Sequence, residues 1–218
     1  MTDNIFVLSE SKNIGNRFLS ELRDTDVQQD RMRFRRNLER LGEILAYEMS
    51  RQLSYQAIDV NTPLGVKTMS LPSTDPVIVG ILRAGVPFLQ GFMNYFDRAD
   101  VGFVGAYRKE DGPELSVNID YLSVPSLEGR PVILIDPMLA TGRSVVDAVN
   151  ALIPKGKPSH LFIASVVSAP EGIKRVTEEV SLPFSLWTCA IDDKLNDSAY
   201  IVPGLGDAGD LSYGMRAL

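Results

Sequence analysis

The chain has 218 residues, of which 44% are hydrophobic and 23% are charged, and its formal net charge at pH 7 is -6. This composition is that of a globular protein and argues against a disordered chain. The length suits one domain, or one domain with an appended arm. The negative charge disfavours broad nucleic-acid binding, because the phosphate backbone requires a basic surface, although it does not exclude a local basic patch.

The potential metal ligands are few. Cys189 is the only cysteine and His160 the only histidine, which excludes an intrachain disulfide, a four-thiolate metal site and a multi-histidine site. We expect Cys189 to pack in the last strand and His160 to begin a strand with a satisfied hydrogen bond. The adjacent acids Asp192 and Asp193 are expected to be solvated turn residues and not a metal pair.

The N-terminal residues MTDNIFVLSESKN contain neither a basic segment nor a long apolar stretch, so they do not have the pattern of a signal peptide. No apolar run reaches the roughly 18 residues that a membrane helix needs. These features predict a soluble cytoplasmic protein that does not associate with membranes.

Apolar residues at helical spacing from Phe34 to Met49 predict a long helix over 28–53. After this segment, apolar β-branched runs alternate with helical segments, which predicts crossover units and a parallel sheet. The expected strands cover 75–82, 101–108, 130–136, 160–169 and 183–192, and the expected helices cover 86–96, 144–153 and 170–180. The glycine-rich tail from Asp193 onward is expected to be a shaped loop and not a helix.

The buried strand over 130–136 ends in an acid and is followed by a turn of small residues. In open α/β sheets, ligands bind at the carboxyl ends of the strands, where Asp136 stands. We expect Ser144 to cap the next helix, with Asp147 completing a capping box. The turn from Thr141 to Ser144 would then present backbone N–H groups and the helix dipole to an anion. A phosphate in the turn with hydroxyls beside the acid would suit a ribose 5-phosphate, although the same strand, turn and capped helix also occur without a ligand.

Two common nucleotide motifs do not stand where they would carry a nucleotide function. The sequence has no G-x-x-x-x-G-K-[ST], and no G-x-G-x-x-G directly follows its first strand, which argues against a P-loop NTPase and a dinucleotide enzyme. Instead, DPMLATGRS resembles the phosphoribosyl pyrophosphate (PRPP) motif of the type I phosphoribosyltransferases, in the version found in uracil phosphoribosyltransferases, where a proline follows the single acid. The segments ILRAG (81–85), YR (107–108), APEG (169–172) and YIVPGLGDAGD (200–210) match the same family, so the resemblance spans most of the chain.

The resemblance implies an α/β protein with the type I phosphoribosyltransferase fold: a central parallel β-sheet flanked by helices, an N-terminal helical arm and a C-terminal hood loop. It implies a single domain over 1–218, made of an N-terminal arm and helix (1–70), a PRPP-binding core (75–192) and a uracil-binding hood and tail (193–218). The implied activity is that of a pentosyltransferase of pyrimidine salvage, which makes UMP and pyrophosphate from uracil and PRPP.

The resemblance also assigns roles to single residues. Asp136 would accept hydrogen bonds from ribose hydroxyls, and Arg83 and Arg108, each at the end of an apolar strand, would contact the pyrophosphate through bidentate guanidinium bonds. These three are the implied catalytic residues, and the alternative for the two arginines is an ordinary surface position. The full implied PRPP-binding set is Arg83, Arg108, Asp136, Pro137, Met138, Leu139, Ala140, Thr141, Gly142, Arg143, Ser144 and Asp207.

Uracil presents O2, N3–H and O4 along its edge, and backbone groups held by glycine turns can bind such a row at fixed spacing. By resemblance, Ile201, Gly206, Asp207 and Ala208 contact uracil, and Asp207 also reaches the metal or PRPP through water. The alternative for this segment is an Ω-loop with structural glycines.

The implied cofactor is Mg²⁺, held through PRPP and water with no direct protein ligand. It would neutralise the leaving pyrophosphate together with the arginines, and because the motifs contain no histidine or cysteine base, positioning and electrostatics would carry the reaction. Residues 109–120 are expected to be either a mobile flap over the site or a β-hairpin arm at a dimer contact. A homodimer or higher homo-oligomer is expected, and GTP is a candidate effector on which the sequence does not decide.

The chain departs from the family pattern at a few positions. Arg143 stands where glycine is usual, although its backbone N–H keeps the phosphate cradle. Ala199 stands where glycine is common, Leu211 replaces a common basic residue, and Tyr213 replaces a common phenylalanine. These changes bear on regulation and affinity more than on the type of reaction.

Two alternative functions stay open on the sequence. A purine base is one alternative substrate, although a purine site would want an aromatic stacking residue and a lysine, which the glycine-rich tail does not provide. The other alternative is a regulator that keeps the PRPP fold and binds RNA of pyrimidine operons, which would need a coherent basic face. We interpret Arg33, Arg36 and Arg40 as a solvated helix face, with phosphate or partner contact as the alternative.

Overall fold

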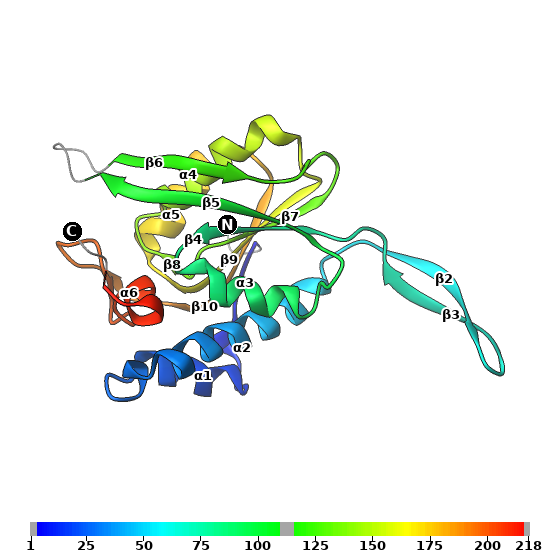
Figure 1. Cartoon of the computed structure of the whole chain (residues 1–218), viewed down its shortest axis with the longest axis horizontal. Coiled ribbons are helices and arrows are strands. Elements are labelled where there is room, and N and C mark those ends of the chain that lie inside the picture. The colour runs from blue at the N-terminus through cyan, green and yellow to red at the C-terminus, as the bar shows by residue number, and fades with distance from the viewer. Residues whose placement is uncertain (1–3, 110–115, 216–218) are drawn as a thin grey trace.

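The computed structural model of the chain describes residues 4–109 and 116–215 and has an α/β fold (Figure 1). The helices are α1 (Gly15–Arg23), α2 (Arg31–Ser50), α3 (Gly85–Met93), α4 (Arg143–Leu152), α5 (Pro170–Glu179) and α6 (Ala208–Tyr213), and the 3-10 helices are η1 (Leu8–Glu10), η2 (Val27–Gln29) and η3 (Ile153–Lys155). The strands are β1 (Ile5–Val7), β2 (Tyr55–Thr62), β3 (Gly65–Pro72), β4 (Val77–Leu82), β5 (Asp100–Lys109), β6 (Ser116–Ser123), β7 (Pro131–Ile135), β8 (Met138–Leu139), β9 (His160–Ser168), β10 (Phe184–Ile191), β11 (Lys194–Leu195) and β12 (Ile201–Val202).

The central sheet has the strand order β1-β10-β9-β7-β4-β5-β6, and β8 also pairs with β9. All described pairs in this sheet are parallel except β5 with β6, so the predicted alternation of strands and helices is confirmed. The central strands β4 and β7 are apolar throughout because both faces of the sheet are covered. Helices α1, α2 and α3 pack on one face and α4 and α5 on the other, which gives one apolar core on each side of the sheet (Figure 1).

The long helix predicted over 28–53 is shorter at both ends. Its N-terminal residues form η2, and α2 begins only at Arg31 because the Asp30 side chain accepts hydrogen bonds from the backbone N–H of Met32 (3.0 Å) and Arg33 (3.1 Å). This N-cap satisfies two donors that the first helical turn leaves without an intrahelical partner. The acidic N-cap was the available signal in the sequence, and the apolar spacing alone did not contain it.

The arm expected over 1–70 includes a β-hairpin that the helical pattern did not predict. Strands β2 and β3 pair in antiparallel register from Tyr55 opposite Pro72 to Thr62 opposite Gly65, and every residue of both strands is exposed. The hairpin extends away from the body of the protein (Figure 1). Of the segment 109–120, Lys109 ends β5 and residues 116–120 belong to β6, which pairs antiparallel with β5, and residues 110–115 lie outside the described part of the chain.

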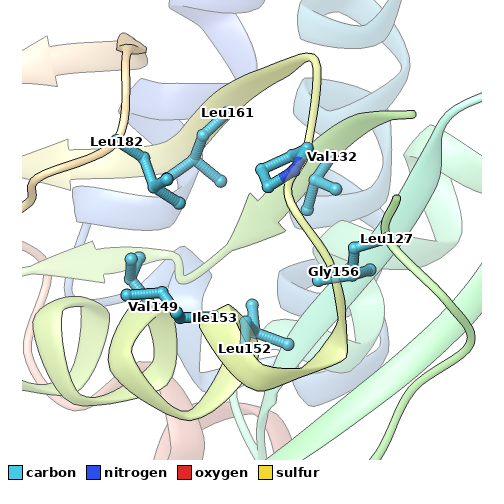
Figure 2. Close-up of a pocket in the computed structure, with 9 residues that line it drawn as sticks. Leu127, Val132, Val149, Leu152, Ile153, Gly156, Leu161 and Leu182 are labelled. Atoms are coloured by element: carbon cyan, nitrogen blue, oxygen red, sulfur yellow. The ribbon is translucent and has the colours of Figure 1, made fainter. Parts of the chain in front are cut away.

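A small apolar void marks the amino ends of the strands, opposite to the ligand-binding edge expected for this type of sheet (Figure 2). Its volume is about 10 Å³, and its lining includes Val132 at the start of β7, Leu161 at the start of β9 and Leu152 at the end of α4. An apolar void of this size is a packing defect and not a ligand site.

Within residues 4–109 and 116–215, no helix is both long enough and apolar enough to cross a membrane.

Candidate active site

The turn after β7 brings the expected phosphate cradle to the carboxyl end of the sheet. The Asp136 Oδ1 atom accepts a hydrogen bond from the backbone N–H of Met138 (3.2 Å), so the carboxylate folds over the start of its own turn. Met138 and Leu139 form β8, which pairs with β9 and so fixes the path of the turn. Helix α4 then begins at Arg143, and its first turn directs backbone N–H groups toward the end of the strand.

The expected capping box at Ser144 and Asp147 is wrong. The N-cap of α4 is Gly142, which has a left-handed backbone (φ 76°) and no side chain to cap with, so Ser144 lies inside the helix. The nearest side-chain support is the Thr141 Oγ1 atom, which accepts a hydrogen bond from the backbone N–H of Arg143 at 3.4 Å. Burial raises the pKa of Asp147, and the nearby Arg143 guanidinium opposes that shift.

Close backbone packing explains the glycines of two motifs. A Cβ atom on Gly142 would lie 2.7 Å from the carbonyl oxygen of Gly172, and a Cβ atom on Gly172 would lie 2.4 Å from the carbonyl oxygen of Ala140. Helix α5, which contains the APEG motif, therefore packs directly on the turn after Asp136. The Arg175 Nη1 atom on the same helix donates to the carbonyl oxygen of Thr141 (3.2 Å) and holds the turn from the other side.

Arg83 follows β4 and reaches the C-terminal segment. Its Nη2 atom lies 3.0 Å from Asp210 Oδ1 of α6, and both side chains are about one-third exposed. Its Nε atom is buried and, among the described residues, has no hydrogen-bond partner. The second expected pyrophosphate ligand, Arg108, pairs with Val117 through the backbone of β5 and β6, and its side chain lies outside the described part of the structure.

The expectation that the tail contains no helix is wrong for residues 208–213. These residues form α6, because Asp207 caps the helix and its Oδ1 atom accepts a hydrogen bond from the backbone N–H of Asp210 (2.9 Å). The remaining tail has turns as expected, and Gly204 (φ 62°) and Gly206 (φ 90°) both have left-handed backbones. Of the expected uracil ligands, Ile201 in β12 and Ala208 in α6 are buried, and Gly206 and Asp207 lie on the turn between them.

The structure gives a physical reason for the glycine that is common at the position of Ala199. Ala199 has a left-handed backbone (φ 59°), the conformation that glycine adopts without a steric penalty. This explains why glycine is suited to this position at the start of the hood. The neighbouring turn is closed by Asn196, whose Oδ1 atom accepts a hydrogen bond from the backbone N–H of Tyr200 (2.9 Å).

The expectation that Asp192 is a solvated turn residue is wrong. Its side chain is only 5% exposed and forms an ion pair with Arg23 of α1 (2.6 Å between Nη2 and Oδ1). The sequence distance of 169 residues between the two hid this contact. Both Arg23 and the segment 203–207 line a cleft of about 680 Å³, whose opposite wall is η2.

Asp210 and Arg175 are site residues that the sequence reasoning did not identify. Asp210 belongs to the quoted GDAGD segment, and its position one helical turn from Asp207 was the available signal. Arg175 lies in no recognised sequence motif, and its contact with the turn becomes evident only from the packing of α5.

Outside this site, His160 and Cys189 behave as expected. The His160 Nε2 atom lies 3.0 Å from Ser185 Oγ, and burial lowers the pKa of the imidazole. Cys189 is buried in β10, and burial raises the pKa of its thiol. Among the described residues, no group of three or more histidine, cysteine, aspartate or glutamate side chains is arranged to hold a metal ion.

A mostly parallel sheet with an acid and an amide-lined turn after a central strand, and with a separate C-terminal hood, defines the type I phosphoribosyltransferase fold, so this expectation is confirmed. Residues 9–215 match the family model described as uracil phosphoribosyltransferase. The chain is 45% identical over 202 residues to the uracil phosphoribosyltransferase of Porphyromonas gingivalis, which covers 92% of this chain and 94% of that protein. The chain therefore belongs to the uracil phosphoribosyltransferase family.

Two further proteins are similar to this chain over nearly its whole length. The uracil phosphoribosyltransferase of Sulfolobus acidocaldarius is 37% identical over 221 residues, covering 96% of this chain and 99% of that protein. Among solved structures, the AQ2163 protein from Aquifex aeolicus superposes with a TM-score of 0.87 at 33% identity, over 98% of this chain and 100% of its own.

The close contact between Gly142 and Gly172 predicts a specific cost for a side chain at Gly142. We expect Gly142→Ala to lower the free energy of unfolding by about 2–4 kcal/mol, because a left-handed alanine and a steric clash add together. Urea unfolding measures this loss. Gly129→Ala is the matched control, because Gly129 has a similar φ of 68° and open space around it, and it should lose only about 1–2 kcal/mol. Equal losses in the two variants would contradict the packing argument.

Proposed function

We propose that this protein transfers the 5-phosphoribosyl group of PRPP to N1 of uracil and releases pyrophosphate. The observation that carries the proposal is the meeting of two segments at one edge of the sheet. The amide-lined turn follows β7, the hood follows β10, and these strands run parallel through β9. The ion pair between Arg83 and Asp210 joins the end of β4 to the hood. One edge thus offers an anion cradle, an arginine and a backbone-lined pocket.

The turn after β7 suits the ribose 5-phosphate. Backbone N–H groups in the first turn of α4 bind the phosphate, because they have no intrahelical acceptor and the helix dipole favours an anion there. The hydroxyls of Thr141 and Ser144 add donors, and Asp136 accepts from the ribose hydroxyls. The segment from Pro137 to Ala140 supports the turn from below through β8. Arg143 contributes its N–H to the cradle in the same way as a glycine would.

Arg83 suits the pyrophosphate. Its buried Nε atom offers a donor that an incoming anionic oxygen satisfies, while Asp210 holds the far side of the guanidinium. Arg108 is the second proposed pyrophosphate ligand. Mg²⁺ supplies further neutralisation of the leaving group when it is bound. We propose that the ion is held through PRPP oxygens and water, with Asp207 holding one of its waters.

The hood suits uracil. Backbone groups of Ile201 and of the turn from Gly206 to Ala208 can bind a row of acceptor, donor and acceptor on the pyrimidine edge, because the glycine allows close approach and α6 fixes the end of the turn. We assign none of these residues as a general base, and the proton released from N1 passes to water or to the departing pyrophosphate. Alignment of uracil N1 with C1 of the ribose, together with charge neutralisation at the pyrophosphate, carries the rate.

The contacts of Arg33, Arg36 and Arg40 do not favour an RNA-binding regulator. Arg33 forms an ion pair with Glu21 (3.2 Å) and Arg36 with Glu39, so two of the three arginines that could make a basic face have acidic partners on the protein itself. The third, Arg40, lies over the ring of Phe18 with 5.0 Å between its guanidinium carbon and the ring centroid.

A nucleobase panel tests the proposed reaction. With PRPP and Mg²⁺, we expect UMP formation from uracil and at least about hundredfold less product from cytosine, hypoxanthine and orotate, because the backbone row matches one pyrimidine edge. Removing Mg²⁺ with a chelator should abolish turnover, and adding the ion back should restore it. Repeating the assay with GTP tests the candidate effector. Equal turnover of hypoxanthine would contradict the assignment of the base.

The role of Asp136 is tested by Asp136→Asn. We expect kcat to fall by about hundredfold because the charge that faces the ribose is lost, while the asparagine oxygen can still accept from the N–H of Met138 and keep the turn folded. Steady-state kinetics and a melting curve measure the two effects. The control is Asp75→Asn, which removes an exposed acid near the opposite end of β4. Wild-type turnover in Asp136→Asn would remove this residue from the site.

We also propose a homodimer that covers the β2–β3 hairpin. In the observed register, Ile58, Val60, Met69 and Leu71 share one face of the hairpin, and all four are more than one-third exposed. An isolated two-stranded hairpin is at best marginally stable, and an apolar face of this kind usually meets a partner surface. A second copy of the chain is the partner that the family assignment favours.

The hairpin proposal predicts that Met69→Asp shifts the dimer toward monomer. A charge placed in the middle of the apolar face should raise the dimer dissociation constant by at least about tenfold, as measured by light scattering over a dilution series. Ser70→Asp is the matched control, because Ser70 is the neighbouring residue and lies on the opposite face of the hairpin. A dimer that Met69→Asp leaves unchanged would show that another surface forms the interface.

A further inference from the structure

Two charged side chains far apart in the sequence hold the turn that leads into the uracil segment. The Arg23 Nη1 atom donates to the carbonyl oxygen of Gly204 (2.8 Å), and the Asp192 Oδ2 atom accepts from the N–H of Gly204 (2.9 Å). The same arginine binds both carboxylate oxygens of Asp192, at 2.8 and 2.6 Å. Both backbone polar groups of Gly204 are therefore bound to one ion pair.

This ion pair is attached to the framework of the sheet. Asp192 directly follows β10, and its backbone N–H donates to the carbonyl oxygen of Ser168 at the end of β9 (2.8 Å). Strand β9 pairs with β7 and β8, which carry the phosphate turn. The position of Gly204 is thus set relative to the turn after Asp136 through a short, hydrogen-bonded path.

Gly204 in turn fixes the residues on either side of it. A Cβ atom at Gly204 would lie 2.1 Å from the carbonyl oxygen of Ile201, so the chain between these two residues is a tight turn. Leu205 is buried, and Gly206 begins the segment proposed to contact uracil. A displacement of Gly204 would therefore move Ile201 and Gly206 together.

We infer that Arg23 and Asp192 are positioning residues that set the nucleobase segment at the correct distance from the PRPP turn. This inference rests on the proposed function, and neither side chain is a catalytic residue. A purely structural role would also explain a mostly buried ion pair, since breaking such a pair leaves an uncompensated charge. The two roles differ in what they predict for substrate binding, because only positioning selectively changes the affinity for uracil.

Arg23→Lys separates the two roles. The lysine keeps a positive charge beside Asp192, so the buried carboxylate stays compensated, but one ammonium cannot reproduce the planar fork that binds two carboxylate oxygens and the Gly204 carbonyl together. We expect a melting temperature near that of the wild type, a uracil KM raised by about tenfold, and a PRPP KM within about twofold of the wild type. Arg17→Lys is the matched control, because Arg17 lies on the same helix with its side chain 73% exposed.

Asp192→Asn tests the other side of the contact and should also raise the uracil KM more than the PRPP KM. The inference is overturned if Arg23→Lys melts like the wild type with an unchanged uracil KM. It is equally overturned if both KM values rise together in Arg23→Lys, because that result would show a general loss of structure.

Hydrogen–deuterium exchange provides a readout that does not depend on turnover. Peptides covering 201–208 should exchange faster in Arg23→Lys than in the wild type, while peptides covering 132–142 should not change. Wild-type protein that makes no UMP from uracil would refute the proposed function. In that case the exchange experiment still decides whether the ion pair holds the turn, and unchanged exchange in 201–208 would refute the inference.

Discussion

Direct backbone contact between the turn at Gly142 and the start of α5 at Gly172 is the constraint on which the proposed phosphate site depends. A turn that presents N–H groups to an anion cannot also satisfy them internally, so other parts of the protein must hold its shape. Here the contact leaves no room for a Cβ atom on either glycine, and Arg175 binds the carbonyl oxygen of Thr141. These contacts hold the shape of the turn without a ligand, and such preorganisation would lower the entropic cost of binding at the proposed cradle.

The second half of the site is built differently. The hood contributes little to the main sheet and is anchored by side chains: Asp192 with Arg23 at its base and Arg83 with Asp210 at its end. Between these ion pairs, the apolar side chains of Ile201, Leu205 and Ala208 pack into the core that also contains α2. The ion pair between Arg83 and Asp210 also lies where the pyrophosphate is proposed to bind. A bound pyrophosphate would therefore change the charge around the ion pair that anchors the end of the hood.

The sequence predicted the parallel sheet, its alternation with helices and the turn after Asp136, because these depend on local periodicity and on one continuous motif. It did not predict features that depend on distant contacts. The pairing of Asp192 with Arg23 joins residues 169 positions apart, and an acidic pair at a strand end gives no local sign of burial. The cap at Gly142 was missed because serine is the usual N-cap, whereas this turn requires a left-handed residue. The β2–β3 hairpin was missed although its alternating apolar residues were visible, since no neighbouring element indicated what they face.

The net charge of -6 raises the question of how such a chain attracts a highly anionic substrate. The phosphate turn answers part of it, because backbone N–H groups and the dipole of α4 stabilise an anion without adding a formal positive charge. Formal charge would be needed only at the pyrophosphate, where Arg83 is proposed to bind and has a buried Nε atom without a partner among the described residues. The acidic residues have two other roles. Asp136 is proposed to accept hydrogen bonds from sugar hydroxyls, and Asp207 and Asp210 make contacts that hold the hood. An acidic surface and the proposed phosphate-binding site are therefore compatible, because backbone amide groups can stabilise an anion without adding a formal positive charge.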